Sequence, residues 1–149
     1  MKEIKRILFA TDFSKNSEYA FEYAYFLAKK CDARLLITHV VHVPVDSDTF
    51  DIPHASLESL KKALDDEAQK SMVKFCSDPL HEGDNYETSI VHGLPYDQII
   101  KKARELSADL IVMGTRGRRA GLDRTLFGST AEKVVRLSSL PVMTISLEE

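Results

Sequence analysis

The sequence lacks tryptophan and contains only two cysteines, Cys31 and Cys76. Because these cysteines form no CxxC pair, they supply neither a disulfide framework nor a zinc site, and we expect both to be small buried apolar side chains. No apolar run is long enough to span a bilayer and no signal-peptide segment is visible, so we expect a cytoplasmic protein that does not enter a membrane. The formal net charge of -3 disfavours a dedicated nucleic-acid-binding protein.

Several motifs of nucleotide and metal chemistry are also missing. The chain has no G-x-x-x-x-G-K-[ST], which excludes a Walker-type NTPase, and no G-x-G-x-x-G after its first strand, which disfavours an ordinary dinucleotide site. No Ser/His/Asp constellation indicates a nucleophile. His39 and His42 are three residues apart near a strand end, which is poor geometry for two ligands, so we expect no metal site.

The chain does contain a regular alternation of short apolar runs and helical patterns. Strands are expected over residues 4–10, 34–41, 86–91, 109–113 and 141–146, and helices after Ser14, over about 56–77 and 96–106, and from Ser129. This alternation predicts a single α/β domain over residues 1–149, with a parallel sheet covered by helices. The run 109–113 indicates a central strand, and the run 86–91 an edge strand.

The helical segments carry apolar stripes and terminal signals. Ser14 is expected to cap the first helix, and Pro95 suits the first turn of the third. The stripes that we expect to be buried comprise, in the first helix, Ala20, Tyr23, Ala24, Leu27, Ala28 and Cys31, in the second, Leu57, Leu60, Leu64, Ala68, Met72 and Phe75, and in the last, Ala131, Val134 and Val135.

Two glycine-containing segments form a candidate phosphate cradle. Gly114-Thr-Arg-Gly117 directly follows the most apolar strand, and Gly128-Ser129-Thr130 begins the last helix. Glycine lets a ligand approach the backbone, and the free N–H groups and positive dipole end of a helix start favour an anion. An alternative for Ser129 is purely structural, because Ser129 and Glu132 match the S-x-x-E capping box.

The stretch between the two segments is cationic in an acidic chain. It contains one acid, Asp123, and four arginines, which are Arg116, Arg118, Arg119 and Arg124. This local charge indicates an anionic ligand, although any one of these arginines could also be an ordinary solvated side chain of a loop tip.

Linked motifs in a fixed order resemble the universal stress protein family over nearly the whole chain. They are Ile7-Leu-Phe-Ala-Thr-Asp-Phe-Ser14, Leu36-Ile-Thr-His-Val40, Gly93-x-Pro95, Asp109-Leu-Ile-Val-Met-Gly-Thr-Arg-Gly117, Gly128-Ser-Thr-Ala-Glu132 and Pro141-Val. The resemblance implies a Rossmann-like α/β fold, with a five-stranded parallel sheet in the order 3-2-1-4-5 and helices on both faces. It also implies a homodimer formed by pairing of the last strands, Val142 to Ser146.

One branch of that family binds ATP through G-x-x-G, nine residues and then G-[S/T], and another branch lacks the pattern and does not bind. The chain matches the pattern at Gly114, Gly117, Gly128 and Ser129, but ten residues separate Gly117 from Gly128. We expect the cradle to survive this extra residue, which falls beside Gly121.

Family roles carried over residue by residue give a candidate nucleotide site. The resemblance implies that Ala10 and Thr11 line the wall, Asp12 lies near the adenosine, and Val40 meets adenine through its backbone. It places Met113 and Gly114 beside the ribose and Gly117, Gly128, Ser129 and Thr130 at the phosphates; Arg116 and Arg118 complete the expected site as nearby cations. An Asx turn at the strand end is the alternative for Asp12.

The expected function is therefore that of a dimeric, cytoplasmic stress-response protein regulated by ATP, or by ADP or AMP, with Mg²⁺ bridging the phosphates. No catalytic residue is assigned, because the loop holds only one acid, Asp123, and slow ATP hydrolysis is the most that we expect of it as an enzyme. The alternative is a dimeric interaction protein of the same fold that binds no nucleotide, which the longer glycine spacing favours.

Overall fold

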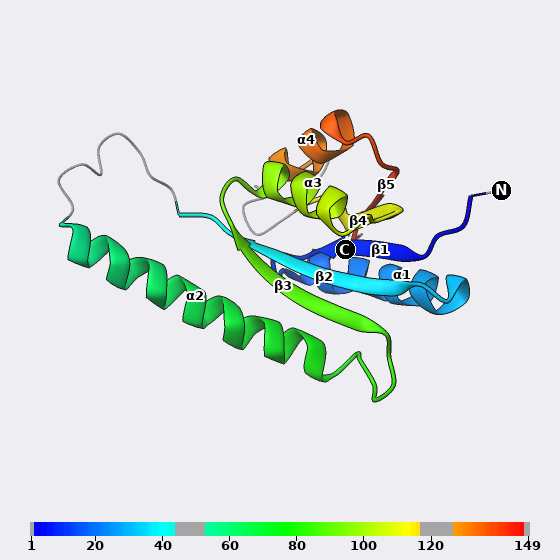
Figure 1. The fold of residues 1–149 in the computed structure, drawn as a ribbon, viewed down its shortest axis with the longest axis horizontal. Coiled ribbons are helices and arrows are strands. Elements are labelled where there is room, and N and C mark those ends of the chain that lie inside the picture. Colours follow the sequence, from blue (N-terminus) through cyan, green and yellow to red (C-terminus); the bar gives the residue numbers. More distant parts are fainter. Residues whose placement is uncertain (1, 44–52, 117–126, 148–149) are drawn as a thin grey trace.

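The structure is a computed structural model, which describes residues 2–43, 53–116 and 127–147. Strands and helices alternate along it as the sequence predicts (Figure 1). In chain order they are β1 (Arg6–Ala10), α1 (Lys15–Cys31), β2 (Arg34–Val41), α2 (His54–Ser77), β3 (Tyr86–His92), α3 (Pro95–Glu105), β4 (Leu110–Gly114), α4 (Ser129–Leu137) and β5 (Val142–Ile145).

The strands form one parallel sheet in the order β3-β2-β1-β4-β5, which confirms the expected topology. In the register of the central strands, Leu8 of β1 lies between Leu36 of β2 and Ile111 of β4. Along the chain, β2 and β3 are added in turn on one side of β1, and the chain then crosses back to place β4 on the other side of β1. Loops that leave β1 and β4 therefore diverge, and in open α/β sheets this is where ligands bind.

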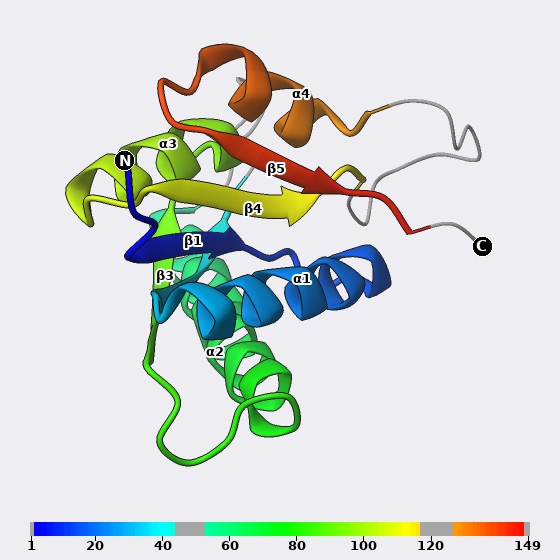
Figure 2. The ribbon, with the colours of Figure 1, turned by 90° about the vertical axis from the view of Figure 1, so that its right-hand side faces the viewer.

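Helices cover both faces of the sheet, with α1 and α2 on one face and α3 and α4 on the other (Figure 2). Along β1, Ile7 and Phe9 belong to the core under α1 and α2, whereas Leu8 belongs to the core under α3 and α4. All three are fully buried, because successive strand residues point to opposite faces and both faces are covered.

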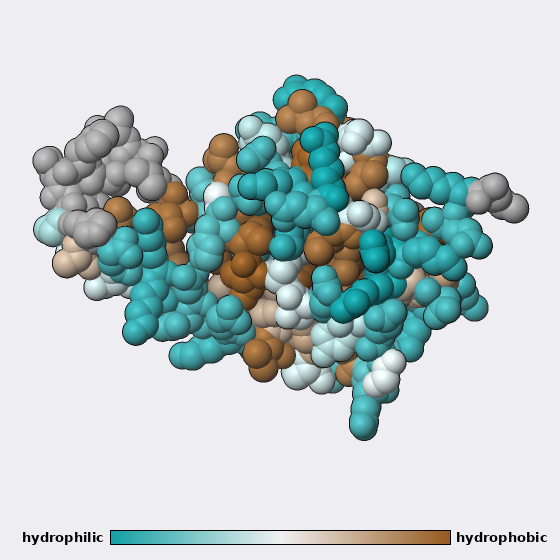
Figure 3. Space-filling view, in the orientation of Figure 1, coloured by the Kyte–Doolittle hydropathy of each residue, from teal (hydrophilic) through white to brown (hydrophobic). Residues whose placement is uncertain are grey.

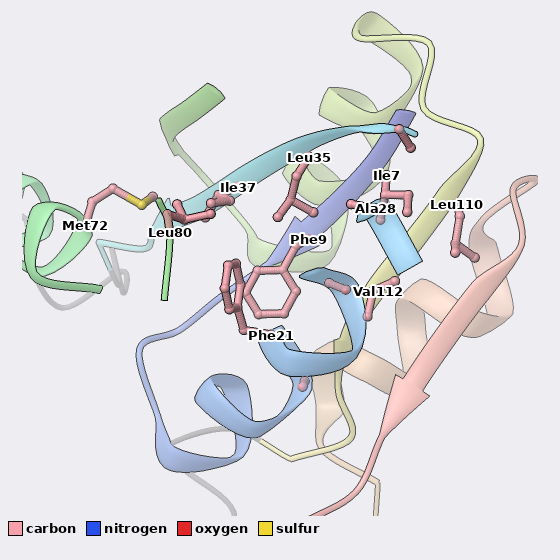
Figure 4. Close-up of a cluster of buried hydrophobic side chains, with 13 residues drawn as sticks. Ile7, Phe9, Phe21, Ala28, Leu35, Ile37, Met72, Leu80, Leu110 and Val112 are labelled. Atoms are coloured by element: carbon pink, nitrogen blue, oxygen red, sulfur yellow. The ribbon is translucent and has the colours of Figure 1, made fainter. Parts of the chain in front are cut away.

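Aromatic rings fill much of the core on the α1 side. Phe9 and Phe21 meet edge to face with ring centroids 5.2 Å apart, and Figure 4 shows them beside Leu35 and Ile37. Phe75 of α2 contacts both rings, at 6.0 Å and 5.2 Å. The two cysteines pack against this cluster but are half-buried rather than fully buried, as each lies near the rim of its helix face.

Helices α1 and α3 begin with the residues that the sequence predicts, whereas α4 does not. The Ser14 side chain accepts a hydrogen bond from the Ser17 N–H and caps α1, and Pro95 occupies the first turn of α3, as expected. The alternative prediction, that Ser129 caps α4 as part of a capping box, is wrong. Gly128 is the N-cap residue of α4, so Ser129 already has helical backbone geometry and its side chain does not cap the helix.

Three apolar side chains that the stripes predicted to be buried are instead exposed: Tyr23 by 42%, Leu60 by 46% and Val135 by 49%. The buried face of α1 is turned toward Phe21, which leaves Tyr23 at its rim. Val135 lies about 100° around α4 from the buried Val134. Leu60 lies on the half of α2 that extends beyond the sheet in Figure 1, where the surface is largely hydrophilic (Figure 3).

None of the described helices has both the length and the apolar character that crossing a bilayer requires.

Candidate functional site

The carboxyl ends of the strands lie on the same side of the molecule as the amino-terminal ends of α1 and α4 (Figure 2). Here Ala10 of β1 pairs with Met113 of β4, and the Thr11 N–H donates to the carbonyl of Thr38 on β2, at 2.9 Å. Val40 follows two residues later on β2 and is half-buried. Ala10, Thr11 and Met113, which were expected near the adenosine, therefore lie at neighbouring strand ends.

The two halves of the candidate cradle are joined by a hydrogen bond. The Gly128 N–H donates to the Thr115 carbonyl at 2.7 Å, while the Thr115 N–H donates to the Ile145 carbonyl at 2.9 Å. The end of β4 and the start of α4 are thus adjacent, although the intervening loop is long. Gly117 and Arg118 lie outside the described residues, as do Arg119 and Arg124.

Helix α4 begins beside the end of β4. Its inner face is anchored by the buried side chains of Ala131 and Val134, and no described side chain caps its first turn. Ser129 is exposed and Thr130 is half-buried. A helix start of this kind presents backbone N–H groups and a partial positive charge, so it can bind an anion.

The turn between β1 and α1 is fixed by short-range hydrogen bonds. An Asp12 carboxylate oxygen accepts from the Ser14 N–H at 3.0 Å, so the Asx turn that we gave as the alternative for Asp12 is present. The Thr11 hydroxyl accepts from the Phe13 N–H at 3.0 Å and from the Ser17 hydroxyl at 2.7 Å. These bonds hold Phe13 at a φ of 63°, a left-handed conformation that is costly for a bulky residue.

The sequence model of the universal stress protein family matches residues 3–146. The chain belongs to the universal stress protein family.

Individual proteins are similar to this chain in sequence or in fold. The universal stress protein MJ0531 of Methanocaldococcus jannaschii is 34% identical over 142 residues, which cover 95% of this chain and 81% of that protein. The solved structure of the hypothetical protein MJ0577 superposes with a TM-score of 0.84 at 26% identity and covers 99% of both chains. A universal stress protein from Archaeoglobus fulgidus, solved in complex with dAMP, has a TM-score of 0.66 at 23% identity and covers 97% of this chain and 99% of that one.

Within this universal stress protein fold, His39 has a role that the sequence analysis missed. Its Nδ1 lies 2.7 Å from the Thr11 carbonyl, which can only accept, so Nδ1 carries the proton and donates. Its ring also lies against Phe13, with centroids 4.3 Å apart. His39 thus supports the β1–α1 turn.

No group of three or more His, Cys, Asp and Glu side chains that could hold a metal ion occurs among the described residues.

Arg116 is bonded to the segment that follows β5. Its guanidinium donates to the Ser146 hydroxyl at 3.4 Å and to the Leu147 carbonyl at 3.2 Å. Asn16 of α1, which sequence reasoning did not single out, bonds to the same two segments. No local sequence signal could have indicated the contacts of Asn16, because its two partners lie 100 and 131 residues away in the sequence.

A cavity of about 120 Å³ lies at the opposite end of the sheet, away from the candidate site. Its main charged group is Asp84, which accepts from the Lys29 ammonium, the Tyr25 hydroxyl and the His81 N–H. The Lys29 hydrogen bond is the largest of the effects that hold the pKa of Asp84 at about 2. Because Asp84 is satisfied by these partners, the cluster fastens the α2–β3 connection to α1 and offers no unpaired group to a ligand.

Proposed function

We propose that this chain binds an adenine nucleotide, ATP first among them, at the carboxyl ends of β1, β2 and β4. The observation that carries the proposal is the hydrogen bond from the Gly128 N–H to the Thr115 carbonyl. It brings the two glycine segments of the family's ATP-binding pattern side by side in a chain whose family membership is established. Thr115 and Gly128 are therefore adjacent even though ten residues separate Gly117 from Gly128 in the sequence.

The phosphates would lie at the amino terminus of α4. Ser129 and Thr130 supply the first N–H groups of the helix, Gly128 would let a phosphate approach because it has no side chain while its own N–H donates to the Thr115 carbonyl, and Gly117 would complete the cradle. Arg116 and Arg118 add positive charge on the loop. Mg²⁺ would bridge the phosphate oxygens, because it prefers such ligands and retains its waters.

The nucleoside would lie at the strand ends between the diverging loops. Thr11 and Met113 are each 5% exposed and Ala10 is 8% exposed, so these residues would form a rigid wall for it. Val40 would meet the adenine through its backbone, Asp12 would lie near the adenosine, and Gly114 beside the ribose. The likeness to the dAMP-bound protein establishes a shared fold, so the ligand class is argued here from these residues.

The biological role would be that of a cytoplasmic regulatory protein of the stress response, whose state depends on bound nucleotide. It would act as a homodimer paired through Val142 to Ser146. In the described part of the chain β5 pairs only with β4, so its outer edge is available to a second copy. Catalysis is not part of the proposal beyond slow ATP hydrolysis, since the sequence offers no general base assigned to the phosphates and only one acid, Asp123, in the loop.

The proposal is tested by mass spectrometry of the small molecules released when purified protein is denatured, followed by equilibrium dialysis with ATP, ADP and AMP. We expect an adenine nucleotide to be released or, from emptied protein, to be taken up. A purified dimer that neither carries an adenine nucleotide nor takes one up at millimolar concentration would overturn the proposal and favour the nucleotide-free interaction protein.

A further inference from the structure

Gly114 has a neighbour that explains why it has no side chain. A Cβ added there would lie 2.3 Å from Nδ2 and 3.2 Å from Cγ of Asn16, and the next atom, the Arg116 carbonyl oxygen, would be 3.5 Å away. The glycines with positive φ in the described chain are Gly83 and Gly93, so the backbone of Gly114 does not itself require glycine. The space above Gly114 is occupied by the Asn16 amide.

The Asn16 side chain is held at both ends of its amide. Nδ2 donates to the Arg116 carbonyl at 2.7 Å, and Oδ1 accepts from the Leu147 N–H at 2.8 Å. The donor and acceptor requirements agree with this orientation of the amide. Asn16 cannot rotate away from an added Cβ without losing at least one of these bonds.

These two bonds connect three segments that are far apart in the sequence. Asn16 lies in the first turn of α1, Arg116 stands where the glycine-rich loop leaves β4, and Leu147 follows β5. The Arg116 guanidinium closes the connection by donating to the Leu147 carbonyl. The direction in which the loop leaves β4 is therefore set by a side chain of another element.

We propose that Asn16 is a positioning residue of the nucleotide site, and that Gly114 is a glycine in order to admit it. This inference rests on the proposed function, because Arg116, whose carbonyl Asn16 holds, lies in the glycine segment expected to hold the phosphates. Asn16 fixes the Arg116 carbonyl next to Thr115, and the Thr115 carbonyl in turn accepts from the Gly128 N–H at the start of α4. The competing explanation is that Gly114 lacks a side chain to let the ribose approach.

A double-mutant cycle separates the two explanations. ATP affinity is measured by calorimetry for the wild type, Gly114→Ala, Asn16→Ala and the double variant. We expect each single variant to weaken binding, by about 3- to 30-fold, and the double variant to bind no worse than Asn16→Ala, because the residues act through one contact. If Gly114→Ala weakens binding by the same factor in both backgrounds, the glycine serves the ligand and the inference is overturned.

Adenosine provides the readout that a merely structural effect would not give. Because Asn16 holds the Arg116 carbonyl beside the expected phosphate cradle, Asn16→Ala should weaken ATP binding while leaving the affinity for adenosine unchanged. Equal losses for both ligands would overturn the positioning role. Asn85→Ala is the matched control, since Asn85 is an exposed asparagine at the other end of the sheet, and it should bind both ligands as the wild type does.

Failure of the proposed function gives a different result. If the wild type binds no ATP, the positioning role of Asn16 is wrong together with the proposed function. The urea unfolding midpoints of the same four proteins still test whether Asn16 is the residue that excludes a side chain at position 114. Gly114→Ala should lower the midpoint in the wild type and have little effect beside Asn16→Ala. Additive losses would show that Asn16 is not what excludes a side chain at position 114.

Discussion

Thr11 is the side chain on which the turn between β1 and α1 depends most. It is 5% exposed, and its hydroxyl accepts from both the Phe13 N–H and the Ser17 hydroxyl, itself 3% exposed. The turn keeps a left-handed Phe13, whose cost is offset by these bonds and by the packing of its ring on His39. The strain thus sits next to the expected adenosine pocket.

Replacing Thr11 with Val should destabilise the protein by about 1–3 kcal/mol, because the buried Ser17 hydroxyl and the Phe13 N–H lose their acceptor while the shape of the side chain is kept. Urea unfolding measures the change. Thr88→Val on the exposed side of β3 is the matched control and should alter stability by less than about 0.5 kcal/mol. Equal stability of the two variants would contradict the role given to Thr11.

Asp84 predicts a pH dependence of stability. Its side chain is 6% exposed, and its pKa in the folded protein is about 2, below the ordinary value of 3.8. A depressed carboxyl pKa contributes stability above the ordinary pKa, and this contribution is lost as the pH falls from about 4 toward 2.

Asp84→Asn should therefore lower the urea midpoint at neutral pH and flatten its fall between pH 4 and pH 2. Asp66→Asn, an exposed acid on α2, is the control and should leave the profile unchanged. A profile of Asp84→Asn parallel to that of the wild type would show that Asp84 is not the group that titrates.

At the scale of elements, α2 shows where periodicity stops being informative. Its 3.6-residue pattern correctly identified Ala68 and Met72 as inward, at 5% and 4% exposure, but also included Leu60. Periodicity tells which face of a helix is apolar, not how far the sheet extends beneath it. The helix is longer than the strands that it covers, and its amino-terminal half has no sheet to pack on.

The two parts of α2 should respond differently to truncation. Met72→Ala removes a buried side chain and should cost about 2–5 kcal/mol, whereas Leu60→Ala should cost less than about 0.5 kcal/mol. Urea unfolding of both variants checks this. A large loss at Leu60 would mean that the projecting half is covered in solution.

The candidate site divides into parts that the sequence could and could not predict. The order of strands follows from alternation and from family motifs, and the structure confirms it. In that order Ala10 pairs with Met113, and Gly128 is bonded to Thr115. The contacts of His39 and Asn16 could not be predicted, since each depends on a partner placed by the fold. Gly114 shows the difference, because sequence reasoning assigned its missing side chain to a ligand, while the structure shows Asn16 there.

At the scale of the whole molecule, β5 is the sheet edge proposed for dimerisation. The carbonyls of Pro141 and Ile145 accept from β4, so the alternation of a parallel ladder turns the main-chain groups of Val142 and Thr144 toward the open edge. An unprotected edge of this kind is a template for pairing with another strand.

Thr144→Pro should remove an outward N–H without breaking the ladder to β4, because proline is tolerated at a sheet edge. We expect the variant to be a folded monomer in sedimentation experiments and Thr144→Val, which keeps the N–H, to remain dimeric. A wild type that sediments only as a monomer, or a proline variant that stays dimeric, would contradict pairing through β5.

The central claim, that the two glycine segments form an adenine-nucleotide site, is tested most directly by titration calorimetry of ATP into nucleotide-free protein and into Gly128→Val. The account predicts one bound ATP per chain for the wild type and loss of binding in the variant, whose added side chain blocks the phosphates at the start of α4 while circular dichroism remains unchanged. No heat with the wild type at millimolar ATP, or equal affinity in a folded Gly128→Val, would contradict it.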